Sequence, residues 1–301
     1  MSNLENDDES WLLALDPDLF TQENGERIQN NLRKTRCVLE RGWTPTFKDQ
    51  MDLGIRSYTL RACGCACVVS LEHRDNGTGS DMWDSAVVVA HYFDQLMKKG
   101  NDSSFLRGRT VVELGSGVGA LGILVSKLGV EKCFLTDLPD CCNLLRRNIA
   151  LNHDNRGENH SAAAEGIEMG IRESTQVAEV VALEWGQPIP MRIREWLTKL
   201  TSEHHNFGES GLVVLASDLL LPFAPELFRP LSETLAALLR LGPTGNESSY
   251  AILAYEERFD CSKFFVEVAA CGMITTRIPD DDLSPVYRDP GRIHVVRLVL
   301  Q

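Results

Sequence analysis

The stretch that decides the fold is Thr110–Gly122, TVVELGSGVGALG, together with the run CFLTD that follows at Cys133–Asp137. A short β-branched run ends at Glu113, glycines follow at alternate positions, and an apolar helical pattern continues from them. This order of strand, glycine turn, helix, strand and acid is the first half of a nucleotide-binding βαβ unit. In such units glycines let the backbone approach a ligand, and the acid binds ribose hydroxyls. The stretch therefore predicts a cofactor that contains adenosine.

The glycine turn is compatible with two classes of cofactor. Gly117, Gly119 and Gly122 satisfy the dinucleotide pattern GxGxxG, and Asp137 follows about 20 residues on, as that pattern requires. The run that begins at Glu113, ELGSGVG, also resembles the pattern E/D-x-G-x-G-x-G of class I methyltransferases, which bind S-adenosylmethionine. That molecule carries an ammonium and a sulfonium and has no pyrophosphate, so a carboxylate at the end of the strand suits it. The turn favours S-adenosylmethionine, with a nicotinamide dinucleotide as the alternative.

Composition predicts a globular enzyme, and the length allows one large α/β domain or two small ones. The chain has 301 residues, of which 43% are hydrophobic and 24% charged, and its net charge is −13. Nucleic-acid binding needs clustered Lys and Arg, so no nucleic-acid partner is expected. The chain contains no apolar run of about 18 residues, and its start lacks the order of a signal peptide. We therefore expect a monomer in the cytoplasm or the nucleus, without a membrane partner.

The chain divides into an extension and one domain. Residues 1–35 are polar and acidic and predict a flexible N-terminal extension, and residues 36–301 predict a single catalytic domain. Apolar alternation over 37–71 predicts a β-hairpin, with Ser57–Leu71, SYTLRACGCACVVSL, as its longer limb. Residues 153–175 are polar and rich in turn formers, and they predict a mobile insertion.

The remaining pattern predicts an α/β fold. After a helix near Trp83–Lys98, seven strands alternate with helices: Thr110–Leu114, Cys133–Asp137, Ala178–Leu183, Gly211–Asp218, Ser249–Tyr255, Met273–Ile278 and Ile293–Leu300. The last two strands are joined by 279–292, PDDDLSPVYRDPGR, which leaves no room for a crossover helix, so the last strand must be antiparallel. The expected fold is a seven-stranded, mostly parallel Rossmann-like sheet with an antiparallel last strand, preceded by an N-terminal hairpin. Class I methyltransferases have this sheet, whereas dehydrogenases do not.

The cysteines do not follow a metal-binding pattern. Cys63, Cys65 and Cys67 alternate, so on one strand they would face the same side. Structural zinc sites usually combine two C-x₂-C pairs, and this sequence has none. We therefore predict reduced cysteines that pack as small hydrophobic residues, and no metal.

Over about residues 55–300 the chain resembles the methyltransferase-16 family of seven-strand protein-lysine methyltransferases. The resemblance rests on the order and spacing of short motifs: MWD (82–84), VVELGSGVGALG (111–122), LTDLPD (135–140), NIALN (148–152), ALEWG (182–186), ASDLLL (216–221), AYEERF (254–259) and IHVVRL (293–298). It implies S-adenosylmethionine as cofactor and a lysine of a protein substrate as acceptor. The motifs are most similar to a member that modifies an AAA ATPase, which implies an AAA ATPase or chaperone-like protein as partner.

The resemblance also implies roles for individual residues. Cofactor contacts are implied for Trp83, Glu113, Gly115, Ser116, Gly117, Asp137, Leu138, Trp185 and Ala216. Asp218 is implied as the catalytic residue that orients the acceptor amine, and Tyr255 and Glu256 are expected beside it on the substrate side. One position departs from the family, because Leu221 stands where the family has a tyrosine three residues after the aspartate. Tyr255 is expected to replace part of the missing aromatic wall.

Two other functions share the cofactor-binding half of the sequence. A small-molecule methyltransferase would use the same glycine turn and acid, and only the ALEWG and YEER motifs argue against it. A cofactor-binding protein without catalytic activity is the second, because the family tyrosine is replaced by Leu221. The sequence favours the protein-lysine methyltransferase over both.

Overall fold

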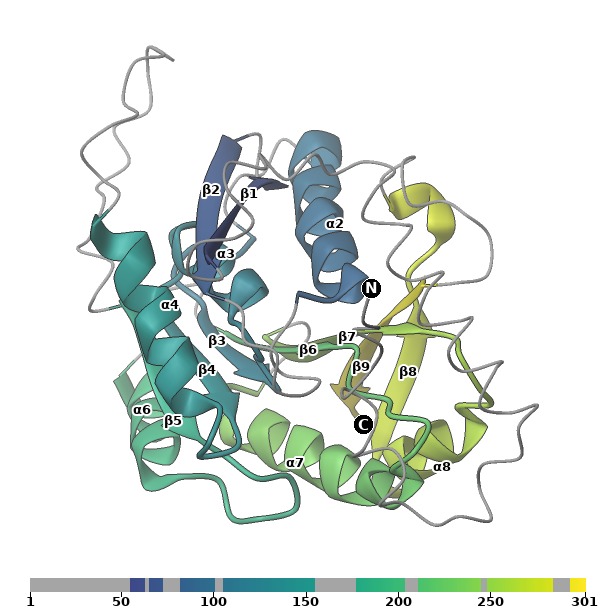
Figure 1. The fold of residues 1–301 in the computed structure, drawn as a ribbon. Coiled ribbons are helices and arrows are strands. Elements are labelled where there is room, and N and C mark those ends of the chain that lie inside the picture. The colour runs from purple at the N-terminus through teal and green to yellow at the C-terminus, as the bar shows by residue number, and fades with distance from the viewer. Residues whose placement is uncertain are drawn as a thin grey trace, which may run out of the picture.

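The computed structural model describes residues 55–62, 65–72, 82–100, 105–154, 177–203, 211–244, 248–283 and 293–301. Within these ranges the chain forms a seven-stranded sheet with helices on both faces, and a separate two-stranded hairpin (Figure 1). The predicted extension, 1–35, lies outside the described residues, as do all but the first two residues of the predicted insertion. The proposed division into extension, domain and insertion therefore stays a prediction.

The elements follow one another in βα alternation. The hairpin consists of β1 (Ile55–Ala62) and β2 (Cys65–Glu72). The strands of the large sheet are β3 (Thr110–Leu114), β4 (Lys132–Asp137), β5 (Ala178–Ala182), β6 (Leu212–Ser217), β7 (Ser249–Glu256), β8 (Met273–Arg277) and β9 (Ile293–Leu300). The helices are α2 (Asp84–Gly100), α3 (Ala120–Ser126), α4 (Cys142–Asp154), α6 (Met191–Glu203), α7 (Phe228–Leu241) and α8 (Ser262–Ala270), with short 3₁₀ helices η5 (Pro225–Leu227) and η6 (Asp280–Asp282). All seven predicted strands of the sheet are confirmed.

The strand order of the large sheet is β5-β4-β3-β6-β7-β9-β8. Neighbouring strands are parallel from β5 to β7, and β9 is antiparallel to both of its neighbours. Six strands thus run in one direction and β9 in the other, which confirms the predicted antiparallel last strand. After β3 the chain builds outward through β4 and β5 and then returns to β6 on the other side of β3. Ligands of open α/β sheets bind at such a switch point, beyond the carboxyl ends of the strands.

The N-terminal hairpin is confirmed, but its predicted position was wrong. Ser57–Leu71, expected as one limb, is divided between β1 and β2, which pair antiparallel with Ala62 opposite Cys65. Apolar alternation does not mark the reversal, because the pattern continues from one strand into the next. Cys63 lies outside the described residues, and β2 begins at Cys65.

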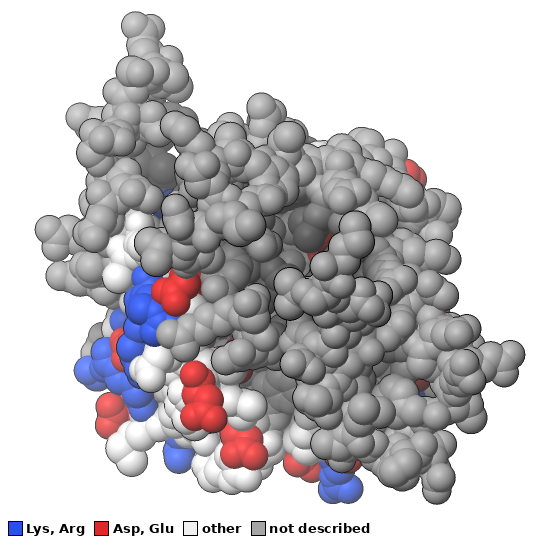
Figure 2. All heavy atoms as spheres, in the orientation of Figure 1, with Lys and Arg blue, Asp and Glu red and all other residues white. Residues whose placement is uncertain are grey.

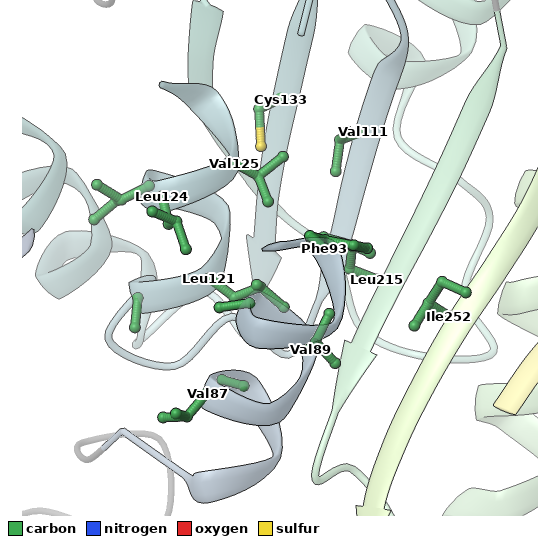
Figure 3. Packing of buried hydrophobic residues seen from close by; sticks show 14 of the residues in the cluster. Val87, Val89, Phe93, Val111, Leu121, Leu124, Val125, Cys133, Leu215 and Ile252 are labelled. Carbon is green, nitrogen blue, oxygen red and sulfur yellow. The ribbon is translucent and has the colours of Figure 1, made fainter. Parts of the chain in front are cut away.

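Two hydrophobic clusters cover the two faces of the sheet. In one cluster, Phe93 of α2 and Leu121 and Val125 of α3 pack on Val111 and Leu215 of the sheet, each at most 1% exposed (Figure 3). The other cluster packs α6, α7 and α8 against the opposite face, below the sheet in Figure 1. Burial of each such side chain contributes about 1.5–3 kcal/mol, so these two layers hold the strand ends in place.

Two asparagines of α4 fasten the hairpin to the domain. Asn148 Oδ1 accepts a hydrogen bond of 2.7 Å from the backbone N–H of Glu72, and its Nδ2 donates one of 2.8 Å to the carbonyl of Val118. Asn152 accepts from the N–H of Ser70 and donates to its carbonyl, at 3.0 and 2.7 Å. The two asparagines are four residues apart, so both face β2 from one side of the helix. Because Val118 belongs to the glycine turn, Asn148 links that turn to the hairpin.

Charged side chains of both signs lie over α4 and α6, at the left of the face shown in Figure 2. Some of them form ion pairs, including Arg147 with Glu72 and Arg192 with Glu179, both at 2.7 Å. Such pairs between exposed groups contribute about 0–1 kcal/mol each, so packing dominates stability here. In the described part of the chain, no helix is both long and apolar enough to cross a membrane.

Candidate functional site

The turn between β3 and α3 depends on glycine. Gly115, Gly117 and Gly119 have φ values of 56°, 55° and 84°, a region that other residues enter only with strain. At Gly115 the space is also restricted, because an added Cβ would lie 2.5 Å from Cδ2 of Leu219 and 3.4 Å from Cζ2 of Trp185. Leu219 follows β6 and Trp185 follows β5. The turn therefore brings the carboxyl ends of three strands into contact at the switch point.

The predicted ribose ligand, Asp137, lies at the end of β4 beside this turn. Its Oδ2 accepts a hydrogen bond of 2.7 Å from the N–H of Gly117, and its Oδ1 accepts one of 2.7 Å from the N–H of Leu138. The N–H of Ser116 donates to the carbonyl of Thr136 at 2.9 Å, so the turn is bonded to β4 at two points. Each carboxylate oxygen can accept more than one hydrogen bond, so Asp137 can also accept from a diol. Leu138, 50% exposed, offers an apolar surface next to it.

Glu113 stabilises the turn through a hydrogen bond in the protein interior. Its side chain is buried, and its Oε2 accepts a hydrogen bond of 3.1 Å from the N–H of Gly122 in α3. Burial raises the pKa of Glu113 to about 8, against the opposing effects of hydrogen bonds from Ser116 and Gly122. A carboxyl group with this pKa is mostly protonated near neutral pH, so it carries little charge toward a ligand ammonium. A direct contact between Glu113 and the cofactor stays a proposal.

Asp218 directly follows β6 and belongs to a buried acidic cluster, which consists of Asp218, Glu256 and Arg258. Its Oδ2 lies 2.5 Å from Nη2 of Arg258, which also lies 3.0 Å from Oε2 of Glu256. The side chains of Asp218, Glu256 and Arg258 are 2%, 8% and 9% exposed, and the guanidinium carbon lies 5.0 Å from the ring centroid of Trp83. Asp218 has a φ of 60°, unusual for a residue with a side chain, and such backbone geometry is often found at functional sites. Burial raises the pKa of Asp218, while the Arg258 guanidinium opposes that rise.

Tyr255 and Glu256 point to opposite faces of the sheet, because successive residues of a strand alternate. The ring of Tyr255 packs against Phe265 of α8 and His294 of β9, with centroids 5.7 and 5.3 Å apart. Glu256 instead reaches Arg258. The two residues predicted on the substrate side are therefore not brought together, and the wall role of Tyr255 stays a prediction.

The other predicted residues lie at the same edge of the sheet. Ala216 is buried near the end of β6, between Leu114 of β3 and Leu253 of β7. Trp83 immediately precedes α2, and Trp185 lies just beyond β5. The structure thus gathers the predicted cofactor residues around the β3–β6 switch point.

Sequence reasoning gave no role to Arg258, Thr136 or Asn148. Arg258 lies within the AYEERF motif, but its partners are 40 and 2 residues away, and its aromatic neighbour is far earlier in the chain. Thr136 Oγ1 donates a hydrogen bond of 2.7 Å to the carbonyl of Glu113 and so joins β4 to β3. The role of Arg258 follows from its contacts with residues that are distant in the sequence, so the motif that contains it does not reveal this role.

The chemistry of these groups suits S-adenosylmethionine. A carboxylate that only accepts hydrogen bonds, Asp137, can bind a ribose diol, and Leu138 and Trp185 provide apolar surface for a flat base. An aromatic ring and a carboxylate are groups that attract a sulfonium, and Trp83 and Asp218 supply them on either side of Arg258. The cofactor has no phosphate for the turn to bind.

The chain is similar in sequence to known lysine methyltransferases. A family model described as lysine methyltransferase matches residues 68–270, about two thirds of the chain. EEF1A lysine methyltransferase 3 of Xenopus tropicalis is 33% identical over 91 residues, 30% of this chain and 38% of that relative. The protein of the same name from Mus musculus is 27% identical over 192 residues, 60% of this chain and 76% of that relative. A solved structure, a TehB-like SAM-dependent methyltransferase from Corynebacterium glutamicum, covers 72% of this chain and 99% of its own at 13% identity, with a TM-score of 0.38.

The match with the frog relative spans well under half of that protein's length. The family match, however, extends from the hairpin strand β2 to the end of α8, across the whole glycine turn and the acidic cluster. It confirms the predicted family, with S-adenosylmethionine as its cofactor and lysine as its class of acceptor, and the observed sheet confirms the predicted fold class. The chain belongs to the lysine methyltransferase family.

Proposed function

We propose that this protein transfers the methyl group of S-adenosylmethionine to the side-chain amine of a lysine in a protein substrate. The observation that supports this proposal most directly is that the glycine turn and the acidic cluster lie next to each other at the β3–β6 switch point. Leu219 packs on Gly115 of the glycine turn, and the residue before it, Asp218, anchors the acidic cluster. A cofactor bound on the turn would therefore have its reactive end beside a buried carboxylate.

The proposed cofactor contacts follow the edge of the sheet. Asp137 would accept hydrogen bonds from the ribose hydroxyls, and Leu138 and Trp185 would flank the adenine. The backbone around Gly115 and Gly117 would contact the methionine part. The remaining proposed contacts are those of Trp83, Glu113, Ser116 and Ala216.

When bound, S-adenosylmethionine supplies a methyl group on a positively charged sulfur, which is a good leaving group. The protein must hold a lysine nitrogen in line with that methyl group, and such alignment can contribute about 7–11 kcal/mol. The lysine must also be neutral, yet at pH 7 only about one such amine in a few thousand is neutral. Buried Leu219 and Leu220 beside Asp218 favour loss of the ammonium proton by desolvation. Asp218 would then orient the amine by accepting one of its N–H hydrogens.

The identity of the substrate is a finer proposal. A net charge of −13 suits a basic protein surface, since opposite charges speed association. Relatives of this chain are named for action on EEF1A or as protein N-lysine methyltransferases, so a protein acceptor fits the family. We propose an AAA ATPase or chaperone-like protein as the substrate, from the motif resemblance, and a monomeric enzyme in the cytoplasm or nucleus.

Transfer of a labelled methyl group tests this proposal. The full chain is incubated with methyl-labelled S-adenosylmethionine and a cell lysate, and mass spectrometry locates the label. The expected result is a methylated lysine nitrogen in a protein. Label on a metabolite would favour a small-molecule methyltransferase, and cofactor binding without any transfer would favour a binding protein. Either result would overturn the proposal.

Asp218→Asn supplies the matched test of the site. This variant keeps the shape of the side chain and removes its charge, so transfer should fall by about 10²-fold or more, as for other lost orienting groups. Binding of S-adenosylhomocysteine should persist, because the adenosine contacts are untouched. Glu195→Gln, an exposed position on α6, should transfer normally. Normal turnover by Asp218→Asn would remove Asp218 from the catalytic role.

A further inference from the structure

Arg258 occupies the centre of the acidic cluster. Its guanidinium contacts the carboxylates of Asp218 and Glu256 and lies over the ring of Trp83, and only 9% of its side chain is exposed. An arginine stays protonated at any pH at which the protein is folded. Its positive charge is therefore a permanent component of this site.

The cluster combines two negative charges with one positive charge, so its net charge is −1 when both acids are ionised. It lies beside the glycine turn, because Leu219, which follows Asp218, packs on Gly115. A ligand that extends from the turn toward Trp83 therefore meets this net charge at close range. In a buried, low-dielectric site, a change of one charge alters binding of a charged ligand strongly.

We propose that Arg258 is a positioning residue that sets the charge of the methyl-transfer site, and thereby its preference for S-adenosylmethionine over S-adenosylhomocysteine. This inference rests on the proposed function. The two molecules share the adenosine and the amino-acid end, and they differ in the methyl group and the positive charge of the sulfonium. Arg258 neutralises one of the two carboxylates. The affinity for S-adenosylmethionine therefore exceeds the affinity for S-adenosylhomocysteine by less than it would with two uncompensated negative charges.

Arg258 also keeps Asp218 available as an acceptor. Burial raises the pKa of Asp218, and the positive charge of Arg258 opposes that rise. Without Arg258, two buried carboxylates would face each other, and one of them would take up a proton at moderate pH. The net charge of the site would then depend more strongly on pH than it does with Arg258 in place.

The neighbouring groups are compatible with this assignment. The thiol of Cys261, just before α8, is close enough for Arg258 to act on it, but burial raises its pKa to about 11, so it is uncharged at neutral pH. Glu257 lies between Glu256 and Arg258 in sequence, but its carboxylate bonds to His294 of β9 at 2.8 Å. Trp83, from the segment before α2, does not titrate. Among the described residues, Asp218 and Glu256 form ion pairs with Arg258. Asp84, which follows Trp83, is also buried and contributes a carboxyl group that every variant shares.

Calorimetric titration of the full chain tests the proposal. Dissociation constants of S-adenosylmethionine and S-adenosylhomocysteine are measured for the wild type, Arg258→Met and Arg258→Lys between about pH 6 and pH 9, and expressed as a ratio. The shared α-amino group titrates in this range but cancels in the ratio. Glu113, whose pKa burial raises to about 8, titrates in this range in every variant, so each ratio is compared with the wild-type ratio at the same pH. Relative to the wild type, the ratio of Arg258→Lys should change little with pH. For Arg258→Met the preference for S-adenosylmethionine should rise with pH, by about tenfold or more, as the second carboxylate ionises.

Two further variants restore or neutralise the site charge. Asp218→Asn combined with Arg258→Met leaves Glu256 alone, so the net charge is −1 once Glu256 is ionised, and the ratio should return to the wild-type value at the upper end of the pH range. Glu256→Gln leaves a neutral site, so its preference for S-adenosylmethionine should fall by about tenfold. Arg229→Met, an exposed position on α7, should behave as the wild type.

Failure of the proposed function and failure of the Arg258 proposal give different results. If the wild type binds neither molecule, the proposed function fails. If both bind and Arg258→Met keeps the wild-type ratio at each pH, Arg258 is only structural and the charge proposal is wrong. Should Arg258→Met fail to fold, an unchanged ratio in Glu256→Gln would overturn the proposal equally.

Discussion

The N–H of Gly117 donates a 2.7 Å hydrogen bond to the carboxylate of Asp137. Gly117 lies in the turn after β3, and Asp137 is the last residue of β4, 20 positions later in the sequence. The bond therefore joins the glycine turn to the end of the neighbouring strand. The same carboxylate is the one we propose as the ribose ligand. Asp137 therefore shapes the turn as well as providing the proposed cofactor contact, and changes at this position should affect both.

Asp137→Ala should weaken binding of S-adenosylmethionine by about 1.5–3 kcal/mol, because it removes charged hydrogen bonds to the ribose and releases Gly117. Asp137→Asn is the matched control, since it keeps one oxygen acceptor and should lose less affinity. Isothermal titration calorimetry measures both. Equal affinity of the wild type and Asp137→Ala would show that the ribose is bound elsewhere.

Gly115→Ala should reduce cofactor affinity by about tenfold or more, which corresponds to about 1.4 kcal/mol. The new Cβ would meet Leu219 in a turn that already needs a φ of 56°. Gly272→Ala provides the control, because Gly272 has a φ of 80° but nothing lies within 4 Å of an added Cβ. Both variants should lose about 1–2 kcal/mol of stability from backbone strain, and only Gly115→Ala should lose affinity. Similar affinities for the two variants would contradict the placement of the cofactor on this turn.

Glu113 should make stability depend on pH. Burial raises its folded-state pKa from 4.5 to about 8, so the folded protein binds the proton more tightly than the unfolded chain does. The resulting stabilisation is complete below about pH 4.5 and is lost as pH rises toward 8, at up to about 1.4 kcal/mol per pH unit.

Glu113→Gln removes this titration and keeps an oxygen that accepts from Gly122. Urea unfolding between about pH 5 and pH 8 should therefore show a flatter dependence for Glu113→Gln than for the wild type. Glu179→Gln is a control of opposite kind, because hydrogen bonding to Arg192 lowers the pKa of Glu179 and its contribution does not change over this range. Parallel curves for the wild type and Glu113→Gln would show that Glu113 is ionised in the folded protein.

Asn148→Ala should destabilise the protein by about 2–4 kcal/mol. Asn148 is fully buried, and its loss would leave the N–H of Glu72 and the carbonyl of Val118 without this partner. Asn143→Ala on the exposed side of α4 should cost less than about 0.5 kcal/mol. Chemical unfolding compares them, and a similar cost for both would mean that Asn148 does not fasten the hairpin.

The sheet was predictable because its signals are local. Runs of β-branched and apolar residues mark the strands, and the 14-residue connection between Ile278 and Ile293 is too short for a crossover helix. The hairpin was misplaced for the same reason, since alternation continues from Ala62 into Cys65 and gives no local sign of a reversal. A local pattern therefore identifies strands well, but it does not locate a turn inside a run of residues whose alternation is unbroken.

The sequence predicted several residues of the acidic cluster individually, but not the contacts that join them. The resemblance to the family picked out Trp83, Asp218 and Glu256, but the cation that joins them, Arg258, depends on contacts between three distant segments. The orientation of Glu113 was equally hidden, because a carboxylate at a strand end can face a ligand or the helix behind it. Here the side chain accepts a hydrogen bond from the N–H of Gly122 in the helix, and its contact with the cofactor stays a proposal.

The position of β9 between β7 and β8 determines the order in which the sheet can be completed. Strands β3 to β7 can pair with one another as soon as each leaves the ribosome. β8 cannot, because among the described strands it pairs with β9 alone, and β9 is synthesised after it. Until Ile293–Leu300 emerges, β7 and β8 each expose an unpaired edge to other nascent chains, and this is the stage at which a chaperone would protect the protein most.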